Sequence, residues 1–237
     1  MTHMPAPIAV AWREYTVESH PFPKLHRLVD TYEAVLKYAT VLAVQNFYTA
    51  GLADQFAEVD RFIRDKIARP HLGEWTGLLC EVLRCFAERE QDLFCRELFL
   101  LHFQRFGANP TPQAHCTDQG ATGRLLTLRN ALAHGATLPD EESTALLQEH
   151  EQDLRTLLDK ADFFTALPLY HIEAETAAGT FQVRLLMSAD YQAATPISLQ
   201  AAALPLGHVV VHNPHTETFL DLHPLLVCTE CLEQVPQ

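Results

Sequence analysis

Positive charge is scarce in this sequence. Lysine and arginine together number 17 against 30 aspartates and glutamates, which gives a formal net charge of -13 at pH 7. Residues 167–237 contain one basic residue, Arg184, and seven acidic ones. This balance excludes a protein that coats nucleic acid through a broad basic surface, because such a surface needs many cations. It does not exclude a nuclease that holds a phosphate with a local arginine.

Other familiar signals are also missing. There is no run of about 18 apolar residues, the length that a membrane-spanning helix needs. The N-terminal residues lack a basic segment before an apolar core, so we expect no secretory signal and a cytoplasmic protein with reduced cysteines. No glycine-rich phosphate loop or nucleophile elbow occurs, which argues against ATP hydrolysis and serine-hydrolase chemistry.

Hydrophobic spacing divides the chain into three parts. Residues 1–23 contain four prolines and no clear period, so we predict an irregular arm. Residues 24–166 are predicted to form an up-and-down helical bundle, because apolar residues recur there at three- and four-residue intervals. The expected helices cover about 24–48, 52–68, 75–88, 93–106, 123–135 and 137–164.

The pattern changes after Pro168. Apolar and polar residues then alternate, which is typical of strands with one buried face. Strands are expected near 170–174, 181–187, 208–212 and 218–222. The predicted fold class is therefore mainly α, with a small antiparallel β appendage over residues 167–237 that packs on the bundle.

The most informative stretch is the end of the predicted helix 123–135, Arg-Asn-Ala-Leu-Ala-His-Gly. An arginine followed by a histidine at similar spacing occurs four times, at 13/20, 64/71, 96/102 and 129/134. Only the last pair combines an uninterrupted helix, a polar residue after the arginine and a histidine directly before a helix-ending glycine.

Arg129 and His134 are the residue types that metal-independent RNA cleavage needs. Histidine titrates in the range required of a general acid or base, and arginine offers planar donors to phosphate oxygens. On one helix the two residues lie roughly 140° apart, whereas Asn130 and His134 share a face. Asn130 could therefore orient the imidazole, and two helices meeting at a two-fold axis would complete a site.

The string Arg-Asn-x-x-x-His, in a helical bundle and followed by Gly135, resembles the signature of the HEPN superfamily. The resemblance implies a bundle over residues 24–166 that forms a homodimer, in which two motifs make one RNA-cleaving site. It implies Arg129, Asn130 and His134 as functional positions, an RNA substrate and no cofactor. HEPN proteins occur in toxin–antitoxin pairs, CRISPR-associated effectors and anti-phage defence, so a bacterial defence or toxin-type system is expected.

An alternative interpretation is that these residues have no catalytic role. An arginine on a helix is usually solvated or ion-paired, and a histidine before a C-terminal glycine is often only a cap. HEPN-like bundles also include silent members that dimerise or bind other molecules. The chain would then be an interaction module of a larger defence or signalling assembly.

A zinc site is a further hypothesis for the C-terminal part. Cys228 and Cys231 have the spacing of a zinc knuckle, and His212 with His215 would complete four ligands. The alternative is that this cysteine pair near the end of the sequence is accidental or half of a site that the chain does not complete.

Overall fold

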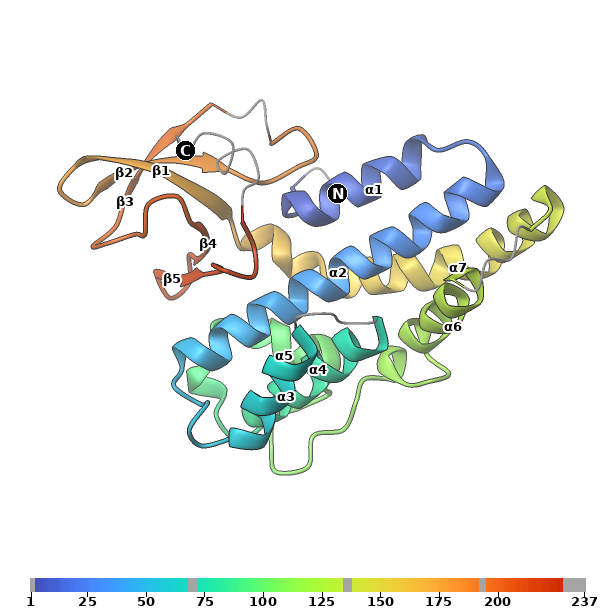
Figure 1. Cartoon of the computed structure of the whole chain (residues 1–237), viewed down its shortest axis with the longest axis horizontal. Coiled ribbons are helices and arrows are strands. Elements are labelled where there is room, and N and C mark those ends of the chain that lie inside the picture. The colour runs from blue at the N-terminus through green and yellow to red at the C-terminus, as the bar shows by residue number, and fades with distance from the viewer. Residues whose placement is uncertain (1–2, 68–71, 134–137, 192–194, 228–237) are drawn as a thin grey trace.

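One long helix, α2 (Pro21–Thr49), is the axis of the molecule in the computed structural model (Figure 1). The structure describes residues 3–67, 72–133, 138–191 and 195–227. In α2, every residue from Tyr38 to Phe47 is buried. A helix buried on all sides must be surrounded by other elements, and α1, α4, α6, α7 and the sheet all contact it.

The remaining helices cover the two sides of α2. Figure 1 shows α1 on one side and α3 to α5 on the other, with the start of α7 at the end far from the sheet. Their bounds are α1 Ala6–Val17, α3 Ala57–Ile67, α4 Leu72–Cys85, α5 Arg96–His102, α6 Ala121–Ala133 and α7 Asp140–Lys160, with 3₁₀ turns at Glu90–Asp92, Ala114–Cys116 and Asp162–Ala166.

The prediction of an irregular arm over residues 1–23 is wrong, because this segment contains α1 and the start of α2. Pro5 is the N-cap of α1, and Pro7 follows in its first turn. Pro21 and Pro23 lie in the first turn of α2. Proline is tolerated at these positions because the first N–H groups of a helix have no intrahelical partner. The four prolines therefore mark helix starts.

The expected helices are otherwise confirmed, with one large difference in length. The segment predicted as helical over 93–106 is helical only from Arg96 to His102. Phe103 is extended and forms an isolated β-bridge with Pro112. Because the ring of Phe103 is fully buried, the apolar spacing of the sequence continues beyond the residue at which the helix ends.

The C-terminal part is a five-stranded antiparallel sheet in the order β3-β2-β1-β4-β5. The mainly helical fold class with a small C-terminal antiparallel sheet is thus confirmed. The predicted strands are present, and β3, with largely exposed residues, was missed. The strands are β1 Leu169–Ala177, β2 Thr180–Leu185, β3 Ile197–Gln200, β4 Val209–Asn213 and β5 Thr218–Asp221.

The sheet shares the hydrophobic core of the helices. Leu169, Val209, Val211 and Leu220 belong to the same buried cluster as the α2 side chains. Buried amides add specific bonds. The Gln45 side chain donates to the carbonyls of Leu222 (3.2 Å) and His223 (2.7 Å). These contacts fix the sheet to one end of α2, because a buried amide without partners would be costly.

Within residues 3–67, 72–133, 138–191 and 195–227, no helix is both long and apolar enough to cross a bilayer.

Two histidines are buried beside the core, at the end of α5 and in the following loop. Burial is the main cause that lowers the pKa of His102, to about 4, and the neighbouring His115 adds to it. Burial also lowers the pKa of His115. An unfolded histidine titrates near 6.5. As the pH falls below that value, the unfolded chain therefore takes up protons before the folded chain does.

We therefore expect the contribution of these histidines to the free energy of unfolding to be constant above about pH 6.5 and to fall as the pH drops toward 4. His102 alone accounts for about 3 kcal/mol of this loss by pH 4. His102→Gln should flatten the dependence in urea unfolding curves measured across this range. The exposed His215→Gln is the matched control and should keep the wild-type slope. Equal slopes for all three proteins would contradict the conclusion that the burial of His102 causes the pH dependence.

Candidate functional site

The predicted site lies on α6, which packs between α2 and α7. Gly120 and Gly123 let this helix begin close to the preceding loop. A Cβ at Gly123 would collide with the backbone of Asp118, and one at Gly120 with the backbone of Ala114 and His115. The chain can therefore turn sharply into α6 only with glycine at these positions.

Arg129 is held on the α2 side of α6. Its Nε donates to Oε1 of Glu33 at 3.3 Å, and its side chain is 29% exposed. The other oxygen of Glu33 accepts from Nζ of Lys37 at 2.6 Å. Glu33 thus bridges two cations at the surface of α2, and the charge of Arg129 is balanced within its own chain.

Asn130 is exposed and lies roughly 100° further round the helix. Its Oδ1 accepts a long hydrogen bond of 3.4 Å from Nη1 of Arg129. The structure therefore brings Arg129 and Asn130 together. His134, the third predicted residue, lies outside the described residues.

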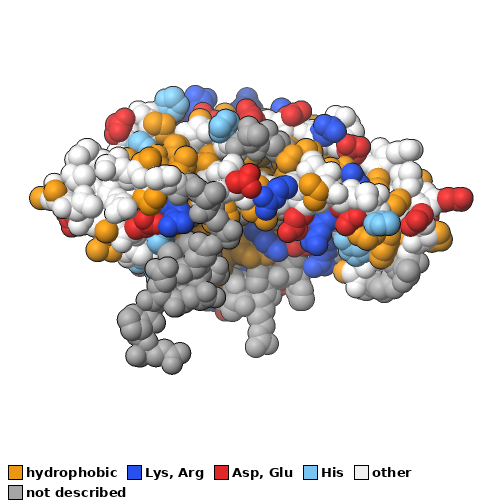
Figure 2. All heavy atoms as spheres, turned by 90° about the horizontal axis from the view of Figure 1, so that it is seen from above, with side chains coloured by type: hydrophobic (Ala, Val, Ile, Leu, Met, Phe, Trp, Pro, Cys, Tyr) orange, Lys and Arg blue, Asp and Glu red, His pale blue; other side chains and the backbone are white. Residues whose placement is uncertain are grey.

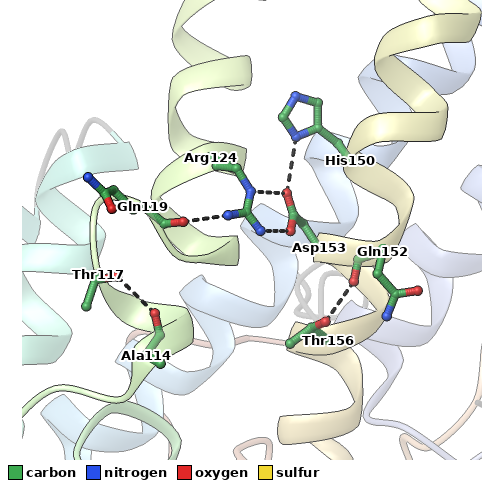
Figure 3. Close-up of polar contacts among 8 residues, drawn as sticks. All are labelled: Ala114, Thr117, Gln119, Arg124, His150, Gln152, Asp153 and Thr156. Atoms are coloured by element: carbon green, nitrogen blue, oxygen red, sulfur yellow. Dashed lines mark hydrogen bonds and ion pairs between the residues drawn. The ribbon is translucent and has the colours of Figure 1, made fainter.

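A second polar cluster joins α6 to α7 (Figure 3). Nε of Arg124 donates to Oδ2 of Asp153 at 2.9 Å, and Nη2 donates to Oδ1, so the pair is bidentate. Nη1 of Arg124 donates to the carbonyl of Gln119. Nδ1 of His150 lies 3.3 Å from the same Oδ2 of Asp153. One carboxylate thus orders an arginine and an imidazole.

Burial suggests a structural role for this cluster. The side chain of Asp153 is 6% exposed, whereas that of Arg124 is 46% exposed. A buried carboxylate needs its partners, because an unpaired buried charge is strongly destabilising. Nδ1 of His150 faces the accepting carboxylate of Asp153, so Nε2 is the ring nitrogen that points away from the cluster.

An apolar groove runs between α6 and α7 beside this cluster. Its volume is about 420 Å³. We call it the α6–α7 groove, and it is lined by Arg124, Thr127, Leu128, Ala131, Leu132, Leu138, Glu142, Leu146, Glu149 and His150. Arg129 is not among these residues. The groove and the Arg129–Glu33 pair therefore lie on different flanks of α6.

A second hollow of about 430 Å³ lies beside the Arg129–Glu33 pair. Glu33, Lys37 and Asp30 contribute its polar lining, and Trp75 with Tyr38 contributes aromatic surface. Figure 2 shows lysines, arginines and acidic side chains interspersed on one face of the molecule, around orange hydrophobic patches. The charge on that face is therefore mixed and is not of one sign.

The Arg124–Asp153–His150 cluster was not predicted from the sequence. The spacing of His150 and Asp153, three residues apart on a predicted helix, was an available signal for a shared face. Arg124 could not be assigned to them, because pairing two helices across 29 residues depends on how the helices pack.

The zinc hypothesis stays a prediction. His212 stacks on Phe219, with ring centroids 4.5 Å apart, and its Nε2 lies 3.5 Å from Oε2 of Glu217. His215 is exposed in the turn between β4 and β5. No group of three or more potential ligands occurs among the residues that the structure describes. Cys228 and Cys231 lie outside those residues.

In comparisons with protein-family models, with curated proteins and with solved structures, the chain has no significant match. The function must therefore be argued from the residues and their geometry.

We expect Asp153→Asn to destabilise the fold, because it leaves Arg124 and His150 without their shared carboxylate. The cost should be about 2–4 kcal/mol, below that of a fully buried pair because Arg124 is partly solvated. Glu151→Gln, two residues earlier on α7, removes an exposed ion pair with Arg155 and should cost under about 0.5 kcal/mol. Urea unfolding of the three proteins tests this, and equal stability of the two variants would contradict the structural role.

Proposed function

We propose that this chain is a HEPN-like, metal-independent endoribonuclease that acts as a homodimer in a bacterial defence or toxin-type system. The observation that carries the proposal is the arrangement of Arg129 and Asn130. Glu33 fixes the guanidinium of Arg129, and the exposed amide of Asn130 lies against it at the C-terminal end of α6. A pre-oriented arginine is what charge stabilisation in a transition state requires.

The proposed chemistry uses the 2′-hydroxyl of RNA as the nucleophile. His134 takes the proton from this hydroxyl as the oxygen attacks the adjacent phosphorus. The bond from phosphorus to the 5′-oxygen breaks, and that oxygen receives a proton, which leaves a 2′,3′-cyclic phosphate and a 5′-hydroxyl. Arg129 stabilises the charge that builds on the phosphate oxygens, and Asn130 orients the imidazole.

The homodimer is part of this proposal because one helix carries only half of a site. On a helix that continues to residue 134, Arg129 and His134 would diverge by roughly 140°. A second copy related by a two-fold axis would supply the missing group to each half.

A second candidate function is a noncatalytic interaction module of a larger defence or signalling assembly. The specific observation in its favour is that Arg129 already has a carboxylate partner in its own chain. Glu33 accepts from both Arg129 and Lys37, which is the arrangement of an ion-pair network that ties α6 to α2. In this function Arg129 is structural, and no RNA is cleaved.

The first test is cleavage of single-stranded RNA in EDTA. We expect activity that leaves 2′,3′-cyclic phosphate ends and spares DNA, which lacks the nucleophile. His134→Ala should lower the rate on the order of 10²–10⁴-fold by removing proton transfer. Arg129→Ala should lower it by about 10²–10³-fold through lost charge stabilisation. Arg155→Ala, an exposed arginine on α7, is the matched control and should retain wild-type activity.

Glu33→Gln separates the two candidates. In the ribonuclease, the amide oxygen that this change introduces can still accept the hydrogen bond that orients Arg129, so cleavage should persist. In the interaction module, Glu33→Gln and Arg129→Ala should lower stability by similar amounts, and no form of the protein should cleave RNA. Equal cleavage by wild type and His134→Ala would contradict the proposed site, provided that circular dichroism shows both to be folded.

A further inference from the structure

The α6–α7 groove is an apolar surface outside the Arg129–Asn130 site. Its floor is made of leucines from both helices and from the segment before α7, namely Leu128, Leu132, Leu138 and Leu146. Leu128 and Leu132 also reach into the main core. The α7 residues from Asp140 to Glu149 are mostly exposed, and Ser143 is the one buried residue among them. This end of the α6–α7 pair therefore has room for a further helix.

The rim of the groove on α7 is acidic. Glu142 and Glu149 line it, and Leu146 lies between them on the same stripe of the helix. Neither glutamate has an ion-pair partner within the part of the chain that the structure describes. Acidic residues in the first turn of α7 interact favourably with the helix dipole. Glu149 lies well beyond that turn, so the dipole does not account for it.

The nearest cation does not neutralise this rim. Arg124 lines the groove, but its guanidinium is committed to Asp153 and to the carbonyl of Gln119. Among the described residues, the groove therefore presents an apolar floor beside a rim whose negative charge exceeds the positive charge that Arg124 supplies, although Arg124 does interact with Glu149. Such a surface repels nucleic acid and anionic lipid and is complementary to a cationic apolar segment.

We propose that the α6–α7 groove binds a cationic amphipathic helix of a partner protein. Leucine-type side chains at i, i+3, i+4 and i+7 of this helix would contact the leucine floor, as in other helix-in-groove complexes. Lysines or arginines beside that stripe would pair with Glu142 and Glu149, which lie roughly 10 Å apart along α7. The bound helix would complete a three-helix arrangement with α6 and α7. This inference does not depend on whether the chain cleaves RNA.

The probe is a fluorescein-labelled peptide of about fourteen residues, with leucines at helical spacing and lysines on the flanks. One control peptide has glutamate in place of every lysine. A second control has the same composition in an order that leaves no apolar face. Fluorescence anisotropy with the full chain should show saturable binding of the first peptide alone, and the binding should weaken as salt is raised.

Two variants locate the binding site. The double change Glu142→Lys and Glu149→Lys should weaken binding at least about tenfold, because it replaces attraction by repulsion. The double change Glu88→Lys and Glu97→Lys alters the net charge equally at exposed positions outside the groove, and should leave affinity within about twofold. Ala131→Trp fills the groove without changing charge and should abolish binding, while circular dichroism stays unchanged.

Three results would overturn the proposal. The first is equal binding of the scrambled or the glutamate peptide, and the second is equal weakening by the two double changes. The third is that no peptide binds and that the chain forms a dimer which Ala131→Trp dissociates. The groove would then be an interface between copies of this chain.

Discussion

The burial of one segment of α2, Tyr38–Phe47, on all sides is the constraint on which the rest of the structure depends. Its ten consecutive buried residues from Tyr38 to Phe47 require neighbours all round. The two amide side chains within this stretch have partners that are distant in sequence. Gln45 holds the segment after β5. Asn46 accepts from the backbone N–H of Phe94 at 2.7 Å and donates to the carbonyl of Asp92 at 3.0 Å. This segment of α2 therefore lies in the core, and its amide side chains bind the segment after β5 and the segment before α5.

The two arginines of α6 illustrate how this packing assigns different roles to similar residues. Arg124 faces α7 and satisfies the buried carboxylate of Asp153. Arg129 faces α2, where its partner Glu33 is shared with Lys37. A partner that is buried and bidentate makes Arg124 a structural element. Under the proposed function, a partner that is partly exposed and shared would leave Arg129 available to a phosphate.

Much of the fold could be predicted from periodicity, because a helix or strand with one buried face repeats its apolar residues. The body of α2 from residue 24 onward and the paired strands β1 and β2 are examples. The N-terminal helix α1 could not be predicted from periodicity, since its prolines resemble loop residues unless their place at a helix start is known. The end of α5 was missed for a different reason, because the buried Phe103 continues the apolar pattern in an extended conformation.

The candidate site was predictable only as a local motif. The sequence placed Arg129 and Asn130 on one helix, and they lie in contact there. Neither Glu33, 96 residues away, nor the pairing of Arg124 with Asp153 could be derived, because both depend on which helices meet. Such long-range partners decide how far the guanidinium of an arginine is free to bind another group.

The central claim is that two copies of α6 meet to form one site. It can be tested by measuring the distance between spin labels at Ala133, an exposed position at the end of α6, with an unnatural amino acid that spares the native cysteines. Double electron–electron resonance on the purified chain should give a narrow, short distance between chains, which disappears when labelled chains are diluted with unlabelled ones. A monomer at micromolar concentration, or a long distance that places the two α6 helices on opposite outer faces, would contradict the account.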